Sequence, residues 1–513
     1  MSKKTKLTIP VFILSDECRE RIRTVSYIGQ KGYTIPKQFL EAPDLVELKK
    51  ELMVQPASHG ISYGPKEKSF PVYRENQEKI YIPRFYGIRR YGVPRNDLSP
   101  GETIHVPFEK PIRDYQDKII QVYIDHVRDK SNTPGGILEV PCGRGKTVMA
   151  LKIISILQNK TLILVHKEFL MNQWIERIQE FLPSARVGII QGQKFEVDDK
   201  DIVIGMIQTL YDRPFPANAF TSFGLTIIDE VHRIGSEEFS KTLLKIITPY
   251  MLGISATVER KDGLTDILYM FIGDKIYSEE RKDEDDVQVR AIQYTNPDVE
   301  YNKVEYDFRD NVKYSTMITK IANFQPRCDF VVQILHDLME DTKQIMVLSH
   351  TRALLTYLSD QINERDPGVQ TGFYIGGMKA DKLRETESKQ IVFATYSMAA
   401  EALDIKTLNT LVMVTPKTDI IQSVGRILRT KGPGKIIVDV VDTHTVFQNQ
   451  WKKRRAFYKK CDYSIRYIGS ENYSGMNCED PVWKRVYSKK TKESDSDSEP
   501  EPIHTCLISL SNI

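Results

Sequence analysis

Cysteine is scarce and scattered in this chain of 513 residues. Its six cysteines lie far apart, and no two of them form a Cys-x-x-Cys pair. This spacing suggests neither a zinc knuckle nor a disulfide framework, so we interpret the cysteines as reduced thiols of an intracellular protein. The sequence also lacks an apolar run of the roughly 18 residues that a membrane span needs, and it lacks a signal-peptide core. We therefore expect a soluble intracellular protein.

An excess of one charge is missing too. Lysine and arginine total 72, aspartate and glutamate total 69, and the formal net charge is +3. Any affinity for nucleic acid must therefore come from local basic patches. Hydrophobic residues make up 41% and charged residues 27% of the chain, which excludes a mostly disordered, collagen-like or membrane-spanning protein. The length predicts about three domains.

Two regions of the sequence alternate short β-branched apolar runs with segments of helical length. Runs without polar alternation are typical of strands buried on both faces, and their alternation with helices indicates parallel sheets. We therefore predict an α/β fold with two tandem parallel-sheet domains, at 104–282 and 290–462. Strands are expected at 136–140, 161–166, 202–206, 225–230 and 251–255, and then at 345–350, 372–377, 391–396, 410–416 and 436–442.

The two ends of the chain differ from these domains. Residues 1–103 are dense in proline and glycine, which predicts a separate accessory domain of the α+β or β-rich type. Residues 463–513 are expected to form a C-terminal extension. Its stretch 493–501 holds five acids and no base, a composition that predicts a disordered acidic tail. The serines of this tail could accept phosphate, although a purely solvating role is the simpler interpretation.

A phosphate-binding loop is predicted directly after the strand at 136–140. Glycines let backbone N–H groups point at phosphate oxygens, and the N-terminus of the following helix adds partial positive charge. Lys146 would reach the β- and γ-phosphates of ATP, and the Thr147 hydroxyl could bind Mg²⁺. Val140 stands where the strict motif has glycine. The predicted nucleotide-binding residues of this loop are Pro141, Cys142, Gly143, Arg144, Gly145, Lys146 and Thr147.

Two carboxylates end the strand at 225–230. Asp229, at the carboxyl end of a parallel strand that faces a phosphate loop, suits Mg²⁺ coordination. Glu230 could orient or deprotonate an attacking water. A charged strand end is common by itself, but the phosphate loop upstream favours the catalytic interpretation.

Two arginines near the end of the second domain are candidates for a role in catalysis. Arg426 and Arg429 are three residues apart, so they share one face of a helix. Arginines that one domain presents to a γ-phosphate held by another stabilise transition-state charge. A surface basic helix would be the default interpretation of an isolated pair.

These segments, in this order, resemble the motifs of superfamily 2 helicases of the DExH type. The phosphate loop resembles motif I, Asp-Glu-Val-His at 229–232 resembles motif II, and the segment 422–429 resembles motif VI. Stretches similar to the other motifs lie at 112–116, 166–174, 207–209, 255–257, 347–351 and 395–404. The resemblance covers about residues 112–443 and implies two RecA-like domains that bind and hydrolyse ATP.

The resemblance also implies roles for single residues. Gln116 would read adenine, and a second group of nucleotide-binding or catalytic residues would comprise Gln422, Arg426 and Arg429. The residues implied to couple the two domains are His232, Ser255 and Thr257. Contacts with the nucleic-acid backbone are implied for Thr209, Thr351 and Thr395. Ala402 stands where motif V usually has glycine.

Within the superfamily, PCG before the Gly-Lys-Thr turn and RKDG at 260–263 resemble transcription-repair and phage branch-migration helicases. The resemblance extends to the transcript-release helicases of poxviruses and their relatives in other large DNA viruses. It implies ATP and Mg²⁺ as cofactors and DNA, more than RNA, as the partner. It also implies transcript release, repair or recombination as the role, with RNA polymerase or repair factors as further partners. The compartment would be the cytoplasm, a viral factory or a virion, with a nuclear location left open.

Other functions fit the same motifs. An RNA helicase would use the same ATPase, and a nucleotide-gated clamp on nucleic acid or polymerase would use it without unwinding. The motor subunit of a restriction-type nuclease is a further alternative, although no segment shows a metal-carboxylate nuclease pattern.

Two basic segments lie outside the motifs. Lys79–Arg95 interleaves cations with aromatic residues. It could bind phosphates and stack on bases, or form a hairpin whose aromatics fill a core. Residues 451–460 place a second basic cluster on a predicted helix, where a solvated helix face is the simpler interpretation.

Overall fold

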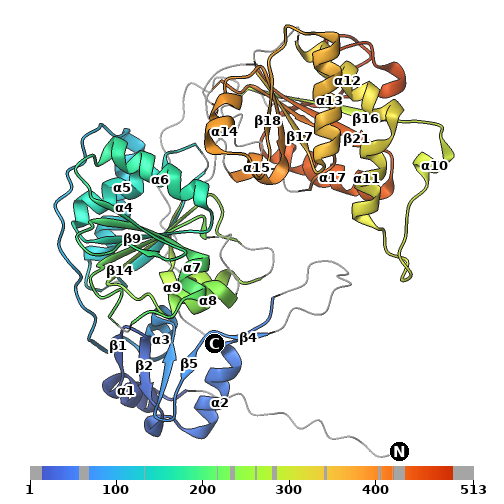
Figure 1. The fold of residues 1–513 in the computed structure, drawn as a ribbon. Helices are drawn as coiled ribbons and strands as arrows, with labels where there is room; N and C mark the ends of the chain where they lie inside the picture. The colour runs from blue at the N-terminus through green and yellow to red at the C-terminus, as the bar shows by residue number, and fades with distance from the viewer. Residues whose placement is uncertain are drawn as a thin grey trace, which may run out of the picture. The chain divides into compact units, whose positions relative to one another are not determined.

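The computed structural model describes residues 14–56, 69–131, 133–141, 143–216, 218–231, 237–259, 263–279, 286–339, 344–401, 405, 407–418, 420 and 434–488. The chain forms two compact units, Met1–Arg281 and Lys282–Ile513 (Figure 1). The predicted site residues that lie outside the described residues are Cys142, His232, Gln422, Arg426 and Arg429. Ala402, residues 260–262 of the RKDG stretch and the acidic stretch 493–501 also lie outside the described residues.

The first unit begins with a small α+β part. Its five-stranded sheet has the order β5-β6-β2-β1-β7, and β3 pairs with β4 beside it. The strands are β1 (Tyr27–Gly29), β2 (Gly32–Pro36), β3 (Met53–Val54), β4 (Phe70–Pro71), β5 (Arg74–Glu75), β6 (Lys79–Ile82) and β7 (Arg95–Asn96). The helices are α1 (Asp16–Val25), η1 (Lys37–Phe39), α2 (Ala42–Glu51) and α3 (Arg84–Tyr91).

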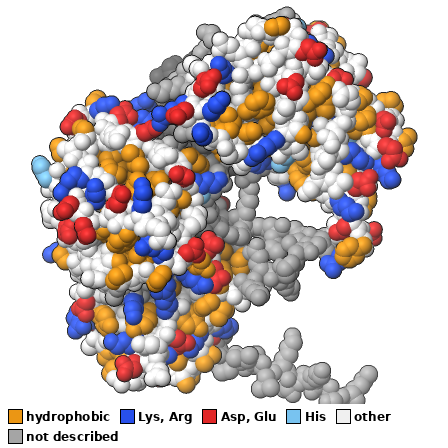
Figure 2. Space-filling model, viewed as in Figure 1, with side chains coloured by type: hydrophobic (Ala, Val, Ile, Leu, Met, Phe, Trp, Pro, Cys, Tyr) orange, Lys and Arg blue, Asp and Glu red, His pale blue; other side chains and the backbone are white. Residues whose placement is uncertain are grey.

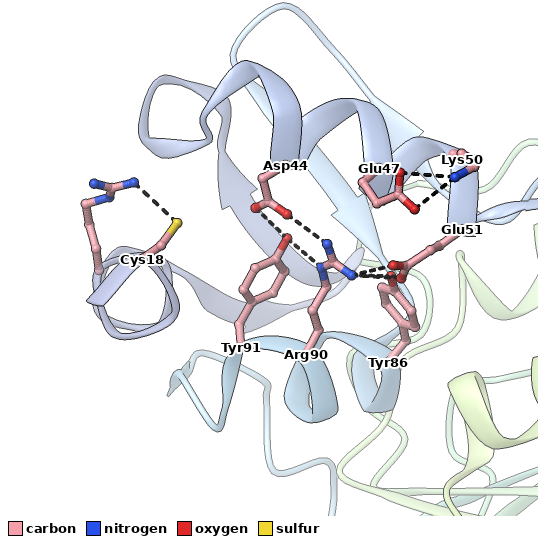
Figure 3. Close-up of polar contacts among 9 residues, drawn as sticks. Cys18, Asp44, Glu47, Lys50, Glu51, Tyr86, Arg90 and Tyr91 are labelled. Atoms are coloured by element: carbon pink, nitrogen blue, oxygen red, sulfur yellow. Dashed lines mark hydrogen bonds and ion pairs between the residues drawn. The ribbon is translucent and has the colours of Figure 1, made fainter. Parts of the chain in front are cut away.

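Helix α3 is held in this part by a network of polar contacts (Figure 3). Arg90 Nη2 lies 2.8 Å from Oδ1 of Asp44, a fully buried residue, and the Tyr91 hydroxyl donates to Asp44 Oδ2 at 3.0 Å. Arg90 Nη1 also lies 2.8 Å from the Glu51 carboxylate, which accepts a hydrogen bond from Tyr86. The charge of Arg90 is thus paired with two carboxylates of the protein, one of them buried.

Helix α3 also docks this part on the larger sheet of the same unit. The buried Arg84 donates through Nη1 to the carbonyls of Thr248 and Pro249, at 2.8 and 3.1 Å. Burial lowers the pKa of Arg84 to about 10. Arg89 pairs with Asp274 at 3.2 Å. Of the two interpretations of Lys79–Arg95, these internal contacts favour packing over a nucleic-acid contact.

The larger sheet of the first unit has eight strands in the order β11-β10-β12-β9-β13-β14-β8-β15, and all its pairs are parallel except β10 with β11. Its strands are β8 (Gly135–Glu139), β9 (Thr161–Val165), β10 (Val187–Gln191), β11 (Lys194–Phe195), β12 (Ile202–Met206), β13 (Leu225–Asp229), β14 (Tyr250–Ser255) and β15 (Lys275–Ser278). The five predicted strands are present, whereas β10, β11 and β15 were not predicted.

Helices cover both faces of this sheet, as the unbroken apolar runs predict (Figure 1). Leu162 and Leu164 of β9 belong to one buried core, and Ile163 and Val165 belong to the opposite one. The first core is completed by α7 (Ile207–Asp212), α8 (Glu237–Leu243) and α9 (Thr265–Ile272). The second is completed by α4 (Asp114–Arg128), α5 (Lys146–Leu157) and α6 (Glu168–Phe181).

The second unit contains another eight-stranded sheet, in the order β18-β19-β17-β20-β21-β16-β22-β23. Its strands are β16 (Val287–Tyr294), β17 (Ile345–Ser349), β18 (Thr371–Tyr374), β19 (Ile391–Thr395), β20 (Thr410–Met413), β21 (Lys435–Asp442), β22 (Ser464–Gly469) and β23 (Lys484–Tyr487). All pairs are parallel except β22 with β23. The segment after 462, expected to be an extension, therefore supplies two strands to this sheet, and the sheet begins at 287 rather than 290.

The helices of the second unit are α10 (Val299–Asn302), α11 (Tyr314–Asn323), α12 (Gln325–Met339), α13 (Arg352–Arg365), α14 (Ala380–Thr386), α15 (Tyr396–Glu401), α17 (Thr445–Lys460) and η3 (Ser470–Asn472). A buried ion pair ties α12 to β21, because Arg327 Nη2 lies 2.9 Å from Asp442 Oδ2 and both side chains are fully buried. No helix in the described part of the chain is long and apolar enough to cross a membrane. Basic and acidic side chains are interspersed over the visible surface (Figure 2).

Candidate active site

The predicted phosphate loop lies between β8 and α5, at the carboxyl edge of the first large sheet. Gly143 and Gly145 have φ of +83° and +80°, in the left-handed region that favours glycine. A Cβ on Gly145 would lie 2.3 Å from Nε2 of Gln116, so a larger residue there would displace the Gln116 side chain from its hydrogen bonds as well as strain the backbone. Helix α5 begins at Lys146, and the N–H groups of its first turn have no intrahelical acceptor. The loop therefore has the shape and the donors of an anion cradle.

Gln116 connects this loop with the start of α4. Its side chain is buried, with 5% exposure. Oε1 accepts a hydrogen bond from the Arg113 N–H at 3.0 Å, and Nε2 donates to the Arg144 carbonyl at 3.0 Å. The structure therefore places Gln116 directly against the phosphate loop.

Arg144 is fixed by two residues that sequence reasoning missed. Its guanidinium lies 3.7 Å from the centre of the Tyr115 ring, and it forms an ion pair with Glu279. The Tyr115 hydroxyl donates to the Arg144 carbonyl at 3.3 Å. Tyr115 precedes Gln116 and could have drawn attention, whereas no sequence signal marks Glu279, which follows the unpredicted strand β15.

The carboxylates at the end of β13 face the lysine of the loop. Lys146 Nζ lies 3.1 Å from Glu230 Oε1. Glu230 has a φ of +50°, a conformation that costs a residue with a side chain about 1–2 kcal/mol. This strained backbone follows a strand in which every residue is buried, and it turns the Glu230 carboxylate to Lys146.

Asp229 occupies a less accessible position, with 7% exposure. Burial raises the pKa of the Asp229 carboxyl and the neighbouring Glu230 carboxylate raises it further, whereas Lys146 lowers it. The indole Nε1 of Trp174 donates to Asp229 Oδ2 at 2.9 Å and also favours the ionised form. Trp174 lies in α6 with 1% exposure. By sequence it resembles an ordinary core residue, and only the tertiary structure directs its N–H to Asp229.

The comparisons with known proteins agree with this geometry. Residues 109–260 match the family model described as the type III restriction enzyme, res subunit. A protein of Acanthamoeba polyphaga mimivirus, whose name describes an ATP-dependent RNA helicase, is 34% identical over 460 residues, which cover 87% of each chain. The chain belongs to the superfamily 2 helicases. This family membership, expected from the motifs, makes the protein an ATP-hydrolysing enzyme of the helicase class.

Two further proteins resemble this helicase. The archaeal DNA 3′-5′ translocase of Sulfurisphaera tokodaii is 25% identical over 398 residues, which cover 67% of the helicase and 84% of the translocase. The solved structure of yeast Dbp5 bound to RNA and ADP-BeF3 matches with a TM-score of 0.48 and 14% identity. That match covers 71% of this helicase and 91% of the Dbp5 chain.

Two of the residues predicted to couple the domains are described, Ser255 at the end of β14 and Thr257 in the turn after it. Ser255 is fully buried, and its hydroxyl donates to the Thr257 carbonyl at 2.6 Å. The Ser255 carbonyl accepts from the Val140 N–H at 2.8 Å, directly ahead of the phosphate loop. These bonds connect the turn after β14 with the residue that precedes the loop. A role in coupling the two domains stays a prediction.

The threonines predicted to contact nucleic acid follow the carboxyl ends of strands in both units of the helicase. Thr209 lies in α7 after β12 and accepts a hydrogen bond from the Gly192 N–H at 2.9 Å. Thr351 is the N-cap of α13 after β17. Thr395 ends β19, with its hydroxyl 3.4 Å from that of Ser397. Ligands of open parallel sheets bind at such edges, and the nucleic-acid role itself stays a prediction.

Proposed function

We propose that this helicase couples ATP hydrolysis to movement along DNA. The observation that carries the proposal is the meeting of Lys146, Asp229 and Glu230 at the carboxyl edge of one sheet, beside a loop with the shape of an anion cradle. The cation Lys146 suits a phosphate, the buried carboxylate of Asp229 suits a divalent cation, and the Glu230 carboxylate suits an attacking water.

The residues fit ATP and Mg²⁺. The left-handed glycines and the first N–H groups of α5 would bind phosphate oxygens, and Lys146 would bind the β- and γ-phosphates. Thr147 and Asp229 offer a hydroxyl and a carboxylate, the oxygen ligands that Mg²⁺ prefers. Gln116 would contact adenine from its place against the loop. When bound, Mg²⁺ neutralises charge on the phosphates and on the leaving group.

The ion pair between Lys146 and Glu230 implies an order of events in the site. A γ-phosphate would compete with Glu230 for the Lys146 ammonium, which would free the Glu230 carboxylate to orient a water and accept its proton. Arg426 and Arg429, with Gln422, would act on the γ-phosphate from the second RecA-like domain. His232, Ser255 and Thr257 would transmit the change between the domains, and Thr209, Thr351 and Thr395 would hold the nucleic-acid backbone.

DNA is the substrate that we propose. The stretch RKDG at 260–263 resembles DNA-acting helicases, and the archaeal relative is named as a DNA translocase. We further propose a role in transcript release or DNA repair, with RNA polymerase or repair factors as partners. An RNA helicase is the second candidate, and the name of the mimivirus relative favours it.

Steady-state ATP hydrolysis by the full chain tests this proposal, measured alone and with single-stranded DNA, duplex DNA or RNA. We expect DNA to stimulate hydrolysis most, and we expect Lys146→Ala and Glu230→Gln to abolish it. Glu230→Gln should retain nucleotide binding, because it keeps the size of the side chain and removes only the base. Stimulation by RNA alone would establish the second candidate. No hydrolysis under any condition would refute the site.

A further inference from the structure

Helix α17 of the second unit gathers cations on the solvent-facing side of its C-terminal half. The sequence of Thr445–Lys460 contains no acidic residue. Its exposed basic residues are Lys452, Lys453, Arg455, Lys459 and Lys460. At 100° per residue, these five positions fall within an arc of about 160° on the helix. They therefore form one continuous basic face.

The other side of α17 fixes the direction of this basic face. Trp451, Arg454 and Tyr458 are buried. Arg454 donates to both carboxylate oxygens of Asp439 in β21, at 2.7 and 2.8 Å, and Nη1 donates to the Lys417 carbonyl at 2.8 Å. The Tyr458 hydroxyl donates to the same carboxylate at 3.1 Å. The helix therefore cannot rotate its cations away from solvent without breaking a buried ion pair.

The described part of the protein does not neutralise the basic face. Among the described residues, no carboxylate forms an ion pair with any of its five cations. Two carboxylates next to α17 have other partners, because Asp439 binds Arg454 and Asp462 accepts from the Tyr487 hydroxyl at 2.7 Å. Lys459 lies 5.7 Å from the centre of the Tyr487 ring, which brings β23 to the border of the face. Five positive charges gathered on one face, in a chain of net charge +3, favour a polyanionic ligand over a merely solvated helix.

We propose that the basic face of α17 binds the phosphate backbone of the nucleic acid on which the helicase acts. This proposal rests on the proposed function. Helix α17 runs from the carboxyl end of β21 back to the amino end of β22, so its cationic half lies away from the edge that holds Thr351 and Thr395. Lys452 to Lys460 span about 12 Å along the axis, which matches three to four nucleotides at about 3.4 Å per nucleotide. The face is thus a second contact, separate from that of the motifs.

The salt dependence of DNA binding tests this proposal. We would compare the full chain with Lys452→Gln/Lys453→Gln/Lys460→Gln, by fluorescence anisotropy of labelled duplex and single-stranded DNA over a range of salt. Each phosphate contact adds about 0.9 to the slope of log K against log salt for duplex DNA and about 0.7 for single strands. We expect the slope to fall by about 2.7 or about 2.1 respectively. Glutamine is a good helix former, so the exposed changes should leave α17 intact.

A matched variant removes the same charge from elsewhere. Lys118, Lys130 and Lys382 are exposed and lie outside α17, and their triple change to glutamine should leave both slopes near the wild-type values. Basal ATP hydrolysis without nucleic acid should be unchanged in both variants. If DNA does not stimulate ATP hydrolysis by the wild type, the proposed function is refuted. If DNA does stimulate it but the α17 variant and the matched variant have equal salt slopes, only the role of the basic face is refuted.

A rival occupant of the face is the acidic stretch 493–501 of the same chain. In that case DNA would bind elsewhere, so the α17 variant would bind DNA no more weakly than the wild type and with the same salt slope. That pair of results would overturn the proposal. Weaker binding and a shallower salt slope in the α17 variant, also when both proteins carry Glu493→Gln/Asp495→Asn/Asp497→Asn, would support it.

Discussion

Replacement of Trp174 by phenylalanine should move the pH dependence of nucleotide binding. The indole N–H donates to Asp229 Oδ2 at 2.9 Å inside the protein, and phenylalanine removes this donor while it keeps most of the packing. A hydrogen bond to a charged group contributes about 1.5–3 kcal/mol. At 1.36 kcal/mol per pKa unit, its loss raises the pKa of Asp229 by about 1–2 units. That shift adds to the increase that burial and Glu230 already cause.

The sign follows from the charge that Mg²⁺ requires. Only the ionised carboxylate binds the cation, so a higher pKa means that binding of a Mg²⁺-loaded, non-hydrolysable ATP analogue needs a higher pH. We expect the acid midpoint of the binding curve to rise by about 1–2 pH units. Well above both pKa values the two proteins should bind equally. Isothermal titration calorimetry across the pH range measures this midpoint.

Trp483→Phe is the matched control for this experiment. Trp483 is buried in the second unit with 2% exposure, and its indole donates to a backbone carbonyl of Gly475 at 3.3 Å, not to a carboxylate. This variant should lose some stability and leave the midpoint unchanged. Equal midpoints in the wild type and in both variants would show that Trp174 does not set the ionisation of Asp229, or that Asp229 does not bind Mg²⁺.

Three further changes have distinct expected outcomes. Gly145→Ala should weaken nucleotide binding at least about tenfold (about 1.4 kcal/mol), because its Cβ would lie 2.3 Å from the side-chain nitrogen of Gln116. Gly192→Ala is the control and should leave nucleotide binding unchanged, because Gly192 also has a positive φ, +57°, but has open space around it. Asp442→Asn breaks the buried ion pair with Arg327 and should lower the free energy of unfolding of the second unit, measured by chemical denaturation, by about 3–5 kcal/mol. A decrease below about 1 kcal/mol would contradict this reasoning. Arg84→Gln removes the hydrogen bonds to two carbonyls, which stabilise the docking of the N-terminal part by about 1.5–3 kcal/mol. Limited proteolysis should therefore release the N-terminal part faster, and an unchanged digestion rate would argue against the docking role.

Local pattern was enough to predict the central strands and the phosphate loop. Strands β9 and β13 are buried at every position, and a strand buried on both faces needs an unbroken apolar run that the sequence shows directly. Strand β10, next to the edge strand β11, alternates buried and half-buried residues, and the edge strand β15 contains no buried residue, so neither has that signal. The loop was predictable because glycine, lysine and threonine meet a local demand of backbone shape and charge.

Contacts between distant parts of the chain were decided by the tertiary structure alone. Trp174 and Asp229 are 55 residues apart, Arg144 and Glu279 are 135 apart, and Arg84 and Thr248 are 164 apart. Periodicity reports which face of an element is buried, but not which side chain of another element lies opposite. The sequence by itself therefore determined the central strands, the family and the loop, because those depend on neighbours along the chain. Packing decided which donor contacts Asp229, what holds Arg144 and where Arg84 docks, because those depend on neighbours in space.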